Sequence, residues 1–297
     1  MSASAGTGGI TIFGPGLIGG SVAMALRAKR PDLPLTVWGR TPSALADLLR
    51  RGLADRIETD PAAAVRDADL VVLCTPVGTM EDLASAFAPA LPADAVVTDA
   101  GSVKLPVVDR LTPILGPRFV GAHPMAGSER SGISAARASL FDSAPCIVTP
   151  GGDTPGDSAC GALARVEDFW TSLGCRITRM TPWEHDRLVA RISHLPHALA
   201  FALVNLVLDT LPPGAQNLAG GSFRDATRVA MSDPSLWTGI LTENRTEVAA
   251  ALRDMAKLLT SMASALGEEK ADSLLDFLTR AKEHRDSLPL PPPDENP

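Results

Sequence analysis

The stretch that decides the fold is Gly14-Pro15-Gly16-Leu17-Ile18-Gly19, which has the spacing GxGxxG. It follows the short apolar run Ile10–Phe13 and precedes the helical stretch Ser21–Ala28. In this strand–turn–helix context the first glycine permits a tight turn, the second lets the backbone approach a pyrophosphate, and the third lets the helix pack against the sheet. The pattern therefore predicts a dinucleotide site, and its residues are Gly14, Gly16, Leu17, Ile18 and Gly19.

Apolar runs and helical stretches alternate along the first part of the chain. Leu35–Trp38, Leu70–Cys74, Ala95–Thr98 and Phe119–Ala122 are strand-like. Leu70–Cys74 is a continuous run rich in β-branched residues, as in a strand that is buried on both faces. Such alternation is typical of βαβ units, so we expect an α/β fold with a parallel sheet between two layers of helices.

From Thr181 onward the pattern is helical only. Thr181-Pro182-Trp183-Glu184 combines an N-cap residue, a proline at the first helical position and a capping box. We therefore expect a Rossmann-type dinucleotide-binding domain over residues 1–180 and an all-helical substrate and dimerisation domain over residues 181–288. The proline-rich stretch 289–297 cannot continue a helix and is predicted to be a disordered tail.

Charge and composition exclude several classes of protein. Lys and Arg number 27 against 34 Asp and Glu, a net charge of −7 that disfavours a nucleic-acid partner. The four cysteines form no CxxC, so neither a zinc site nor a disulfide framework is expected. Met1–Gly9 has no signal-peptide pattern. The longest uncharged stretch, Ile192–Leu208, is shorter than the ~20 residues of a membrane span. We expect a cytoplasmic protein with no membrane partner, whose apolar helix is buried in a homodimer.

The residues after the second predicted strand bear on the choice of cofactor. An NAD-binding fold usually places an acidic residue there, roughly 20 residues after the glycine turn, to bind the ribose hydroxyls. This chain has Gly39-Arg40-Thr41 instead. Gly39 leaves room, and Arg40 with Thr41 suits a 2′-phosphate, although Arg40 is also interpretable as a solvated loop charge. NADP is therefore favoured over NAD, with Thr75 and Pro76, which follow Leu70–Cys74, as further cofactor contacts.

Polar side chains also follow the next two predicted strands. Ser102 and Lys104 come after Val96–Thr98, and His123 comes directly after Phe119–Ala122. Ligands of open parallel sheets bind beyond the carboxyl ends of the strands, so we expect these side chains to face one crevice beside the nicotinamide. A histidine at such a position favours a proton acceptor, whereas Ser102 by itself is equally suited to a turn.

Four motifs together resemble a known enzyme family. GPGLIGGS at 14–21, DAGSVK at 99–104, HPMAGSERSG at 123–132 and SHLPH at 193–197 look like the prephenate/arogenate dehydrogenase family of tyrosine biosynthesis, and FRDATR at 223–228 reinforces the similarity. The resemblance implies oxidative decarboxylation of prephenate to 4-hydroxyphenylpyruvate with hydride transfer to NAD(P)+. The alternative is the same reaction on arogenate, which gives tyrosine.

The resemblance also implies roles for the polar residues at the strand ends. His123 acts as the base on the ring hydroxyl, and Ser102 hydrogen-bonds the same hydroxyl or orients the histidine. Lys104 lies near the nicotinamide or the substrate. His185 and Asp186 fall in the first turn of the predicted helix, where a structural role is at least as well supported.

The resemblance further implies which residues hold the rest of the substrate. Arg228 is similar to the arginine that grips the substrate carboxylate through two hydrogen bonds, and Arg224, one turn earlier, is the rival. His197 and Ser193 reach the side chain of the ring, and Pro196 predicts a kink in the helix that carries them. The motif after His123 adds two substrate-binding candidates, Ser128 and Glu129.

Several alternatives follow from the same residues. His194 and His197 have metal-ligand spacing, but nothing in the sequence completes a ligand set, so no metal is expected. Rival functions are another dehydrogenase with a Rossmann and a helical domain and a non-catalytic NADP-sensing protein. The HPMAGSE sequence at 123–129 argues against the first, and the presence of Ser102, His123 and Arg228 together argues against the second. Prephenate is favoured over arogenate because His197 could offer a donor to the keto acid. Tyrosine is expected as a competitive inhibitor, because the sequence shows no separate regulatory domain.

Overall fold

The computed structural model describes residues 8–128, 130–150, 161–212 and 214–288. Its strands are β1 (Gly9–Phe13), β2 (Leu35–Trp38), β3 (Arg56–Glu58), β4 (Ala68–Leu73), β5 (Val96–Asp99), β6 (Phe119–Pro124), β7 (Pro145–Thr149) and β8 (Arg176–Arg179). Its α-helices are α1 (Leu17–Lys29), α2 (Pro42–Arg50), α3 (Pro61–Ala64), α4 (Met80–Phe87), α5 (Leu105–Leu115), α6 (Ala162–Leu173), α7 (Pro182–Val189), α8 (Leu195–Thr210), α9 (Gly221–Thr227), α10 (Pro234–Glu243), α11 (Arg245–Gly267) and α12 (Ala271–Asp286). The chain forms two compact units, and the boundary between them lies after Val248.

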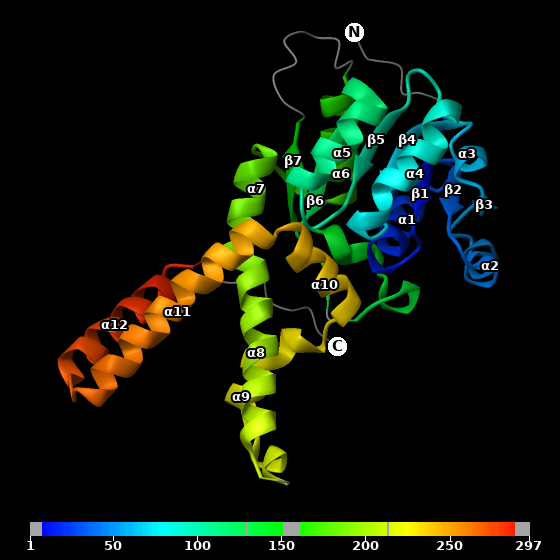
Figure 1. Cartoon of the computed structure of the whole chain (residues 1–297). Helices are drawn as coiled ribbons and strands as arrows, with labels where there is room; N and C mark the ends of the chain where they lie inside the picture. Colours follow the sequence, from blue (N-terminus) through cyan, green and yellow to red (C-terminus); the bar gives the residue numbers. More distant parts are fainter. Residues whose placement is uncertain (1–7, 129, 151–160, 213, 289–297) are drawn as a thin grey trace. The chain divides into compact units, whose positions relative to one another are not determined.

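The strands form one sheet in the order β3-β2-β1-β4-β5-β6-β7-β8 (Figure 1). All neighbours run parallel except β6 and β7, which are antiparallel. The expected α/β fold with a parallel sheet is confirmed, and the reversal at β7 is an addition that the sequence did not predict. Because the chain order reverses beside β1, between β2 and β4, a crevice opens beyond the carboxyl ends of these strands.

Strand β4 shows how the core forms on both faces of the sheet. Leu70 and Val72 pack into one apolar cluster with α1 and α6, and Val71 and Leu73 pack into a second with α4 and α5. Successive side chains of a strand point to opposite faces, so a continuous apolar run is the pattern that a strand buried on both sides requires. This two-sided burial makes the sheet a rigid support for its loops.

The predicted capping box begins a long helix. Thr181 accepts a hydrogen bond from the backbone N–H of Glu184, and the Glu184 side chain accepts one from the backbone N–H of Thr181. Helix α7 continues through a π-helical segment, Ala190–His194, into α8. Pro196 lies two residues after the end of that segment, so the irregularity that proline predicts takes the form of a wider helical turn.

Helix α10 joins the helical elements of the first unit to the sheet. Trp237 and Ile240 are buried in the apolar cluster that contains α4 and α5. The Arg110 guanidinium on α5 donates two hydrogen bonds to the Glu243 carboxylate, at 3.0 and 2.7 Å. These contacts fix α10 beside the ends of the central strands.

One helix of the described residues, Pro182–Thr210, is long and apolar enough to cross a membrane when judged by length and composition alone. Its mean hydropathy is 1.3, and only 11% of the apolar window is buried. The uncharged stretch Ile192–Leu208 lies within this helix, whose start at Pro182 is the one that the capping box predicts.

Candidate active site

The glycine turn opens onto a cavity of about 440 Å³, the smaller of two beside it. Gly14 has φ +93°, a conformation that glycine adopts without the strain a side chain would bring. A Cβ on Gly19 would lie 2.1 Å from the carbonyl oxygen of Gly14, so only glycine lets α1 approach β1 this closely. A Cβ on Gly16 would meet nothing within 4 Å, so the backbone here is open to a ligand.

The start of α1 suits a phosphate. Gly16 is the N-cap of this helix and makes no side-chain cap bond, so the first backbone N–H groups are left for another partner. Thr75 lines both cavities, and its Oγ1 is buried without a hydrogen-bond partner among the described residues. An open N-terminus and an orphaned hydroxyl are what a bound dinucleotide would satisfy, so these residues fit the predicted cofactor.

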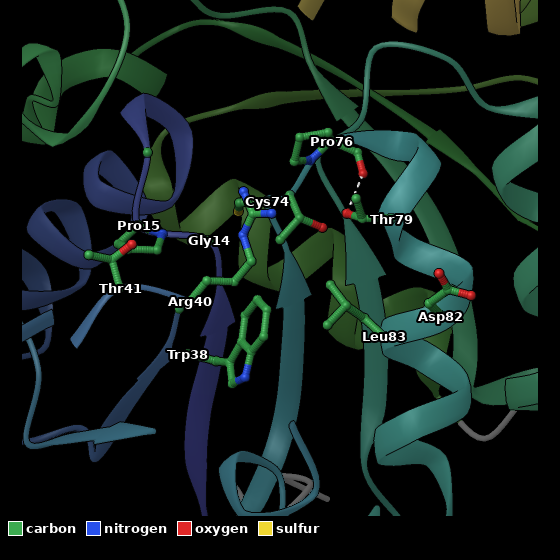
Figure 2. A pocket seen from close by; sticks show the side chains of 13 residues that line it. Gly14, Pro15, Trp38, Arg40, Thr41, Cys74, Pro76, Thr79, Asp82 and Leu83 are labelled. Atoms are coloured by element: carbon green, nitrogen blue, oxygen red, sulfur yellow. Dashed lines mark hydrogen bonds between the residues drawn. The ribbon is translucent and has the colours of Figure 1, made fainter. Parts of the chain in front are cut away.

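The end of β2 forms one side of the smaller cavity. Arg40 and Thr41 line it and are exposed, and Figure 2 shows the Arg40 side chain between Pro15 and Thr79. Thr41 is the N-cap of α2, but its hydroxyl makes no cap bond. Gly39 lines this cavity as well. A Cβ there would lie 3.0 Å from Leu45 Cδ2, so the glycine also permits close packing against α2.

The larger cavity, of about 720 Å³, brings most of the predicted site together. It shares Gly16, Cys74, Thr75 and Pro76 with the smaller cavity, so one extended ligand can enter both. The predicted residues that line it are Gly16, Leu17, Ile18, Thr75, Pro76, Ser102, His123, Ser128, Ser193, His197 and Arg228. Glu129 lies outside the described residues.

Lys104 is placed differently from the prediction. Its side chain is fully buried, its ammonium pairs with the Asp99 carboxylate, and it lines neither cavity. Asp99 also accepts hydrogen bonds from the backbone N–H groups of Gly101 at 2.8 Å and Ala122 at 3.1 Å. Lys104 therefore belongs to a buried ionic cluster behind the strand ends and does not contact substrate directly.

His123 lies at the cavity wall and is 8% exposed. Its Nδ1 lies 2.8 Å from Nε2 of His185, and Nδ1 of His185 lies 2.7 Å from Oδ1 of Asp186. Burial holds the pKa of His123 well below its ordinary value, and the neighbouring His185, Lys104 and His194 lower this pKa further. The ring is consequently neutral at pH 7, which is the state a proton acceptor needs.

The other wall of the cavity comes from helices. His197 stacks on Trp237 with ring centroids 3.6 Å apart, and its Nδ1 donates to the carbonyl oxygen of Ser193 at 2.9 Å. Arg228 lines the cavity, whereas Arg224 is exposed and does not line it. The geometry therefore favours Arg228 over its rival as the anion partner.

Some lining residues escaped the sequence analysis. Trp237 and Arg130 both line the larger cavity. Arg130 stands inside the HPMAGSERSG motif and offers a second cation, a signal that was available in the sequence. Trp237 carries no such signal, because a tryptophan in an amphipathic helix is usually part of the core. Within the described ranges, no group of three or more His, Cys, Asp or Glu side chains lies close enough together to hold a metal ion.

Two family descriptions match this chain in succession. The prephenate dehydrogenase nucleotide-binding domain matches residues 22–179, and the prephenate dehydrogenase dimerization domain matches residues 181–280. Together they cover well over half of the chain. The first match begins after the glycine turn.

Relatives and solved structures agree with these matches. The chain is 37% identical to the cyclohexadienyl dehydrogenase of Zymomonas mobilis over 94% of its length and 95% of the relative. The prephenate dehydrogenase of Aquifex aeolicus, solved with hydroxyphenyl propionate and NAD+, has 34% identity and a TM-score of 0.89, with 95% and 99% of the two chains covered. The arogenate dehydrogenase of Synechocystis has 32% identity and a TM-score of 0.78, with 93% and 98% covered. The chain is therefore a dehydrogenase and belongs to the prephenate dehydrogenase family.

Proposed function

We propose that this dehydrogenase converts prephenate to 4-hydroxyphenylpyruvate and carbon dioxide and passes a hydride to a nicotinamide dinucleotide. The observation that carries the proposal is the larger cavity, where the neutral His123 and the cationic Arg228 share one space that continues into the glycine turn. A ring hydroxyl and a carboxylate are the two groups of prephenate that such residues would hold. Membership of the family supports the same substrate.

The residues divide the reaction between them. Bound nicotinamide supplies the hydride acceptor. As the hydride leaves the carbon that bears the hydroxyl, Nε2 of His123 takes the hydroxyl proton, and the Ser102 hydroxyl bonds the same oxygen. Carbon dioxide leaves from the opposite ring carbon, the bonding electrons complete the aromatic ring, and His123 returns its proton to the phenolate oxygen. Arg228 holds the side-chain carboxylate throughout.

The second candidate is arogenate, and His197 favours it at neutral pH. Because Nδ1 of His197 donates to the Ser193 carbonyl, the neutral ring presents Nε2 as an acceptor. An acceptor suits the ammonium group of arogenate, whereas the keto group of prephenate needs a donor. The donor that the sequence argument assigned to His197 therefore exists only when the ring is protonated.

The finer choice of cofactor remains a proposal. NADP is favoured over NAD because Arg40 and Thr41 line the smaller cavity where an acidic residue would bind the ribose hydroxyls. The Aquifex aeolicus relative was solved with NAD+, so the preference has to be measured directly.

A homodimer through residues 181–288 is supported by the dimerization-domain match and by the exposed leucines of α8. Leu206 is 65% exposed, and apolar faces of this kind mark interfaces. Leu206→Glu should lower the sedimentation coefficient to that of a monomer, whereas the exposed Arg50→Glu on α2 should leave the dimer intact. A parent protein that sediments as a monomer contradicts the proposal. The domain boundary at residue 180 and a cytoplasmic location stay predictions.

The direct test is turnover. The purified protein is incubated with prephenate or arogenate and with NAD+ or NADP+, and the reduced cofactor and the aromatic product are both quantified. Formation of 4-hydroxyphenylpyruvate and reduced cofactor in equal amounts supports the proposal. Turnover of arogenate without turnover of prephenate selects the second candidate, and no turnover with either substrate overturns both.

A further inference from the structure

The hydrogen bonds behind His123 have a direction, and Asp186 sets it. A carboxylate only accepts hydrogen bonds. Oδ1 of Asp186 accepts from the backbone N–H of Lys104 at 2.7 Å, and Oδ2 accepts from the backbone N–H of Leu105 at 2.9 Å. The third group in contact is Nδ1 of His185, at 2.7 Å. Because Asp186 has no proton to give, His185 must carry a proton on Nδ1.

The same reasoning passes through His185 to His123. His185 is fully buried, and desolvation lowers its pKa although Asp186 opposes this shift. A neutral ring with a proton on Nδ1 has a bare Nε2, which can only accept. Nδ1 of His123, at 2.8 Å, must therefore donate to it. This leaves Nε2 of His123 without a proton.

We propose that His185 and Asp186 are positioning residues for this reaction, which hold His123 in the tautomer whose Nε2 faces the substrate as a proton acceptor. The proposal rests on the proposed role of His123 as the base. Three side chains in series thus act as an acceptor, a second imidazole that fixes its tautomer and a carboxylate that fixes the second imidazole. When His123 takes the substrate proton, Asp186 also stabilises the positive charge through His185.

The residues around Asp186 hold its carboxylate in the orientation that makes it the final acceptor of these hydrogen bonds. The Asp186 backbone carbonyl accepts from Nδ2 of Asn244 at 2.8 Å, so the C-cap residue of α10 also holds Asp186 in place. The Lys104 ammonium is buried behind the site and is paired with Asp99. The Asp186 carboxylate is bonded to the backbone N–H groups of Lys104 and Leu105 and to His185.

A matched pair of variants at one position separates positioning from packing. In His185→Gln the side-chain oxygen can still accept from Nδ1 of His123, whereas the thioether of His185→Met, a side chain of similar length, is only a weak acceptor. We expect His185→Met to lower kcat by about 100-fold and to leave the KM for prephenate and the Kd for the cofactor nearly unchanged. His185→Gln should recover kcat to within about tenfold of the parent. Equal losses in the two variants, or a parental kcat in His185→Met, would overturn the proposal.

The tautomer can also be observed without turnover. Nitrogen-15 NMR of the ring nitrogens of the full-length protein should show a proton on Nδ1 and none on Nε2 for both His123 and His185. In His185→Met the His123 signal should lose this single-tautomer signature while the fold, followed by circular dichroism, is retained. A parent His123 with its proton on Nε2 refutes the inference even if prephenate is turned over. If the parent protein turns over neither substrate, the proposed function is wrong. The tautomer of His123 can still be measured in that case, so the two proposals fail independently.

Discussion

The two cavities are built in different ways. The smaller one comes largely from short segments that follow strands, and it includes the backbone of Gly14 and Gly16, while Gly19 lets α1 pack against this turn. The larger one depends on side chains from distant parts of the chain, such as Ser102, His123, His197 and Arg228. A site formed mainly by backbone atoms tolerates substitution of the neighbouring side chains. In a site formed by side chains, each substitution removes the contact that the substituted residue made. The cofactor end should therefore change its preference on substitution, and the substrate end should lose activity.

The largest effect is expected at His123. His123→Ala should lower kcat by roughly 10²- to 10⁴-fold with a small change in KM, because a general base acts in the transition state and contributes little to ground-state binding. Steady-state kinetics with prephenate measure both constants, and His284→Ala on α12 is the control. A near-normal kcat would show that His123 is not the general base. The larger cavity would then tolerate side-chain substitution as the smaller one is expected to do.

Arg228 tests whether one cation serves two ligands. The sequence predicts competitive inhibition by tyrosine, and Arg228→Ala should raise the substrate KM and weaken this inhibition together, because both ligands carry a carboxylate on the chain attached to the ring. The loss of a charge-assisted hydrogen bond costs about 1.5–3 kcal/mol, or roughly 10- to 150-fold. The effect on kcat should be smaller, since the contact exists before and during hydride transfer.

The matched control for Arg228 is Arg224→Ala, one helical turn earlier and outside the cavity. It should leave both the KM and the tyrosine inhibition constant unchanged. If Arg228→Ala weakens the substrate but leaves tyrosine inhibition intact, tyrosine binds elsewhere and the single-site interpretation is wrong.

Substitution of Arg40 tests whether the cofactor end changes its cofactor preference without losing activity. The parent should have the higher kcat/KM with NADP+, and Arg40→Ala should reduce the ratio of the NADP+ to the NAD+ value by about tenfold, because the lost bonds are charge-assisted but exposed. The NAD+ value itself should hardly change. Arg50→Ala, at the other end of α2, is the control. Equal or better kcat/KM with NAD+ in the parent would refute the NADP preference.

The smallest effect is expected from the pH dependence of substrate choice. Burial lowers the pKa of His197 below its ordinary value, and the nearby Arg228 charge lowers this pKa as well. His197 is therefore neutral at pH 7 and becomes a donor only as the pH falls through this lowered pKa. The ratio of kcat/KM for prephenate to that for arogenate should then rise a few-fold on acidification.

The ratio cancels the titration of His123, which affects both substrates equally. His197→Gln has no titratable ring and should give a ratio that is independent of pH. A parent ratio that is flat between pH 5 and 8, or one that falls on acidification, contradicts the assigned hydrogen-bond direction at His197.

Sequence reasoning reached further at the cofactor end than at the substrate end. The glycine turn, Arg40, Thr41, Thr75 and Pro76 were identified, and all of them line a cavity except Gly19, whose role is close packing against Gly14. At the substrate end Ser102, His123 and Arg228 were also identified. Lys104 was misplaced there, because its spacing from Ser102 says nothing about whether its ammonium points to the cleft or to Asp99.

The sequence by itself determined strands β1, β2, β4, β5 and β6, the glycine turn and the capped start of α7, because each depends on interactions within a few residues along the chain. Only the tertiary structure decided what stands behind the predicted base. His123 and His185 are 62 residues apart, and Lys104 and Asp186 are 82 residues apart. Such pairs meet only when α7 packs against α5 and β7. Hydrogen-bond direction and burial, which set the tautomer and the pKa of His123, are properties of that packing and have no local signature.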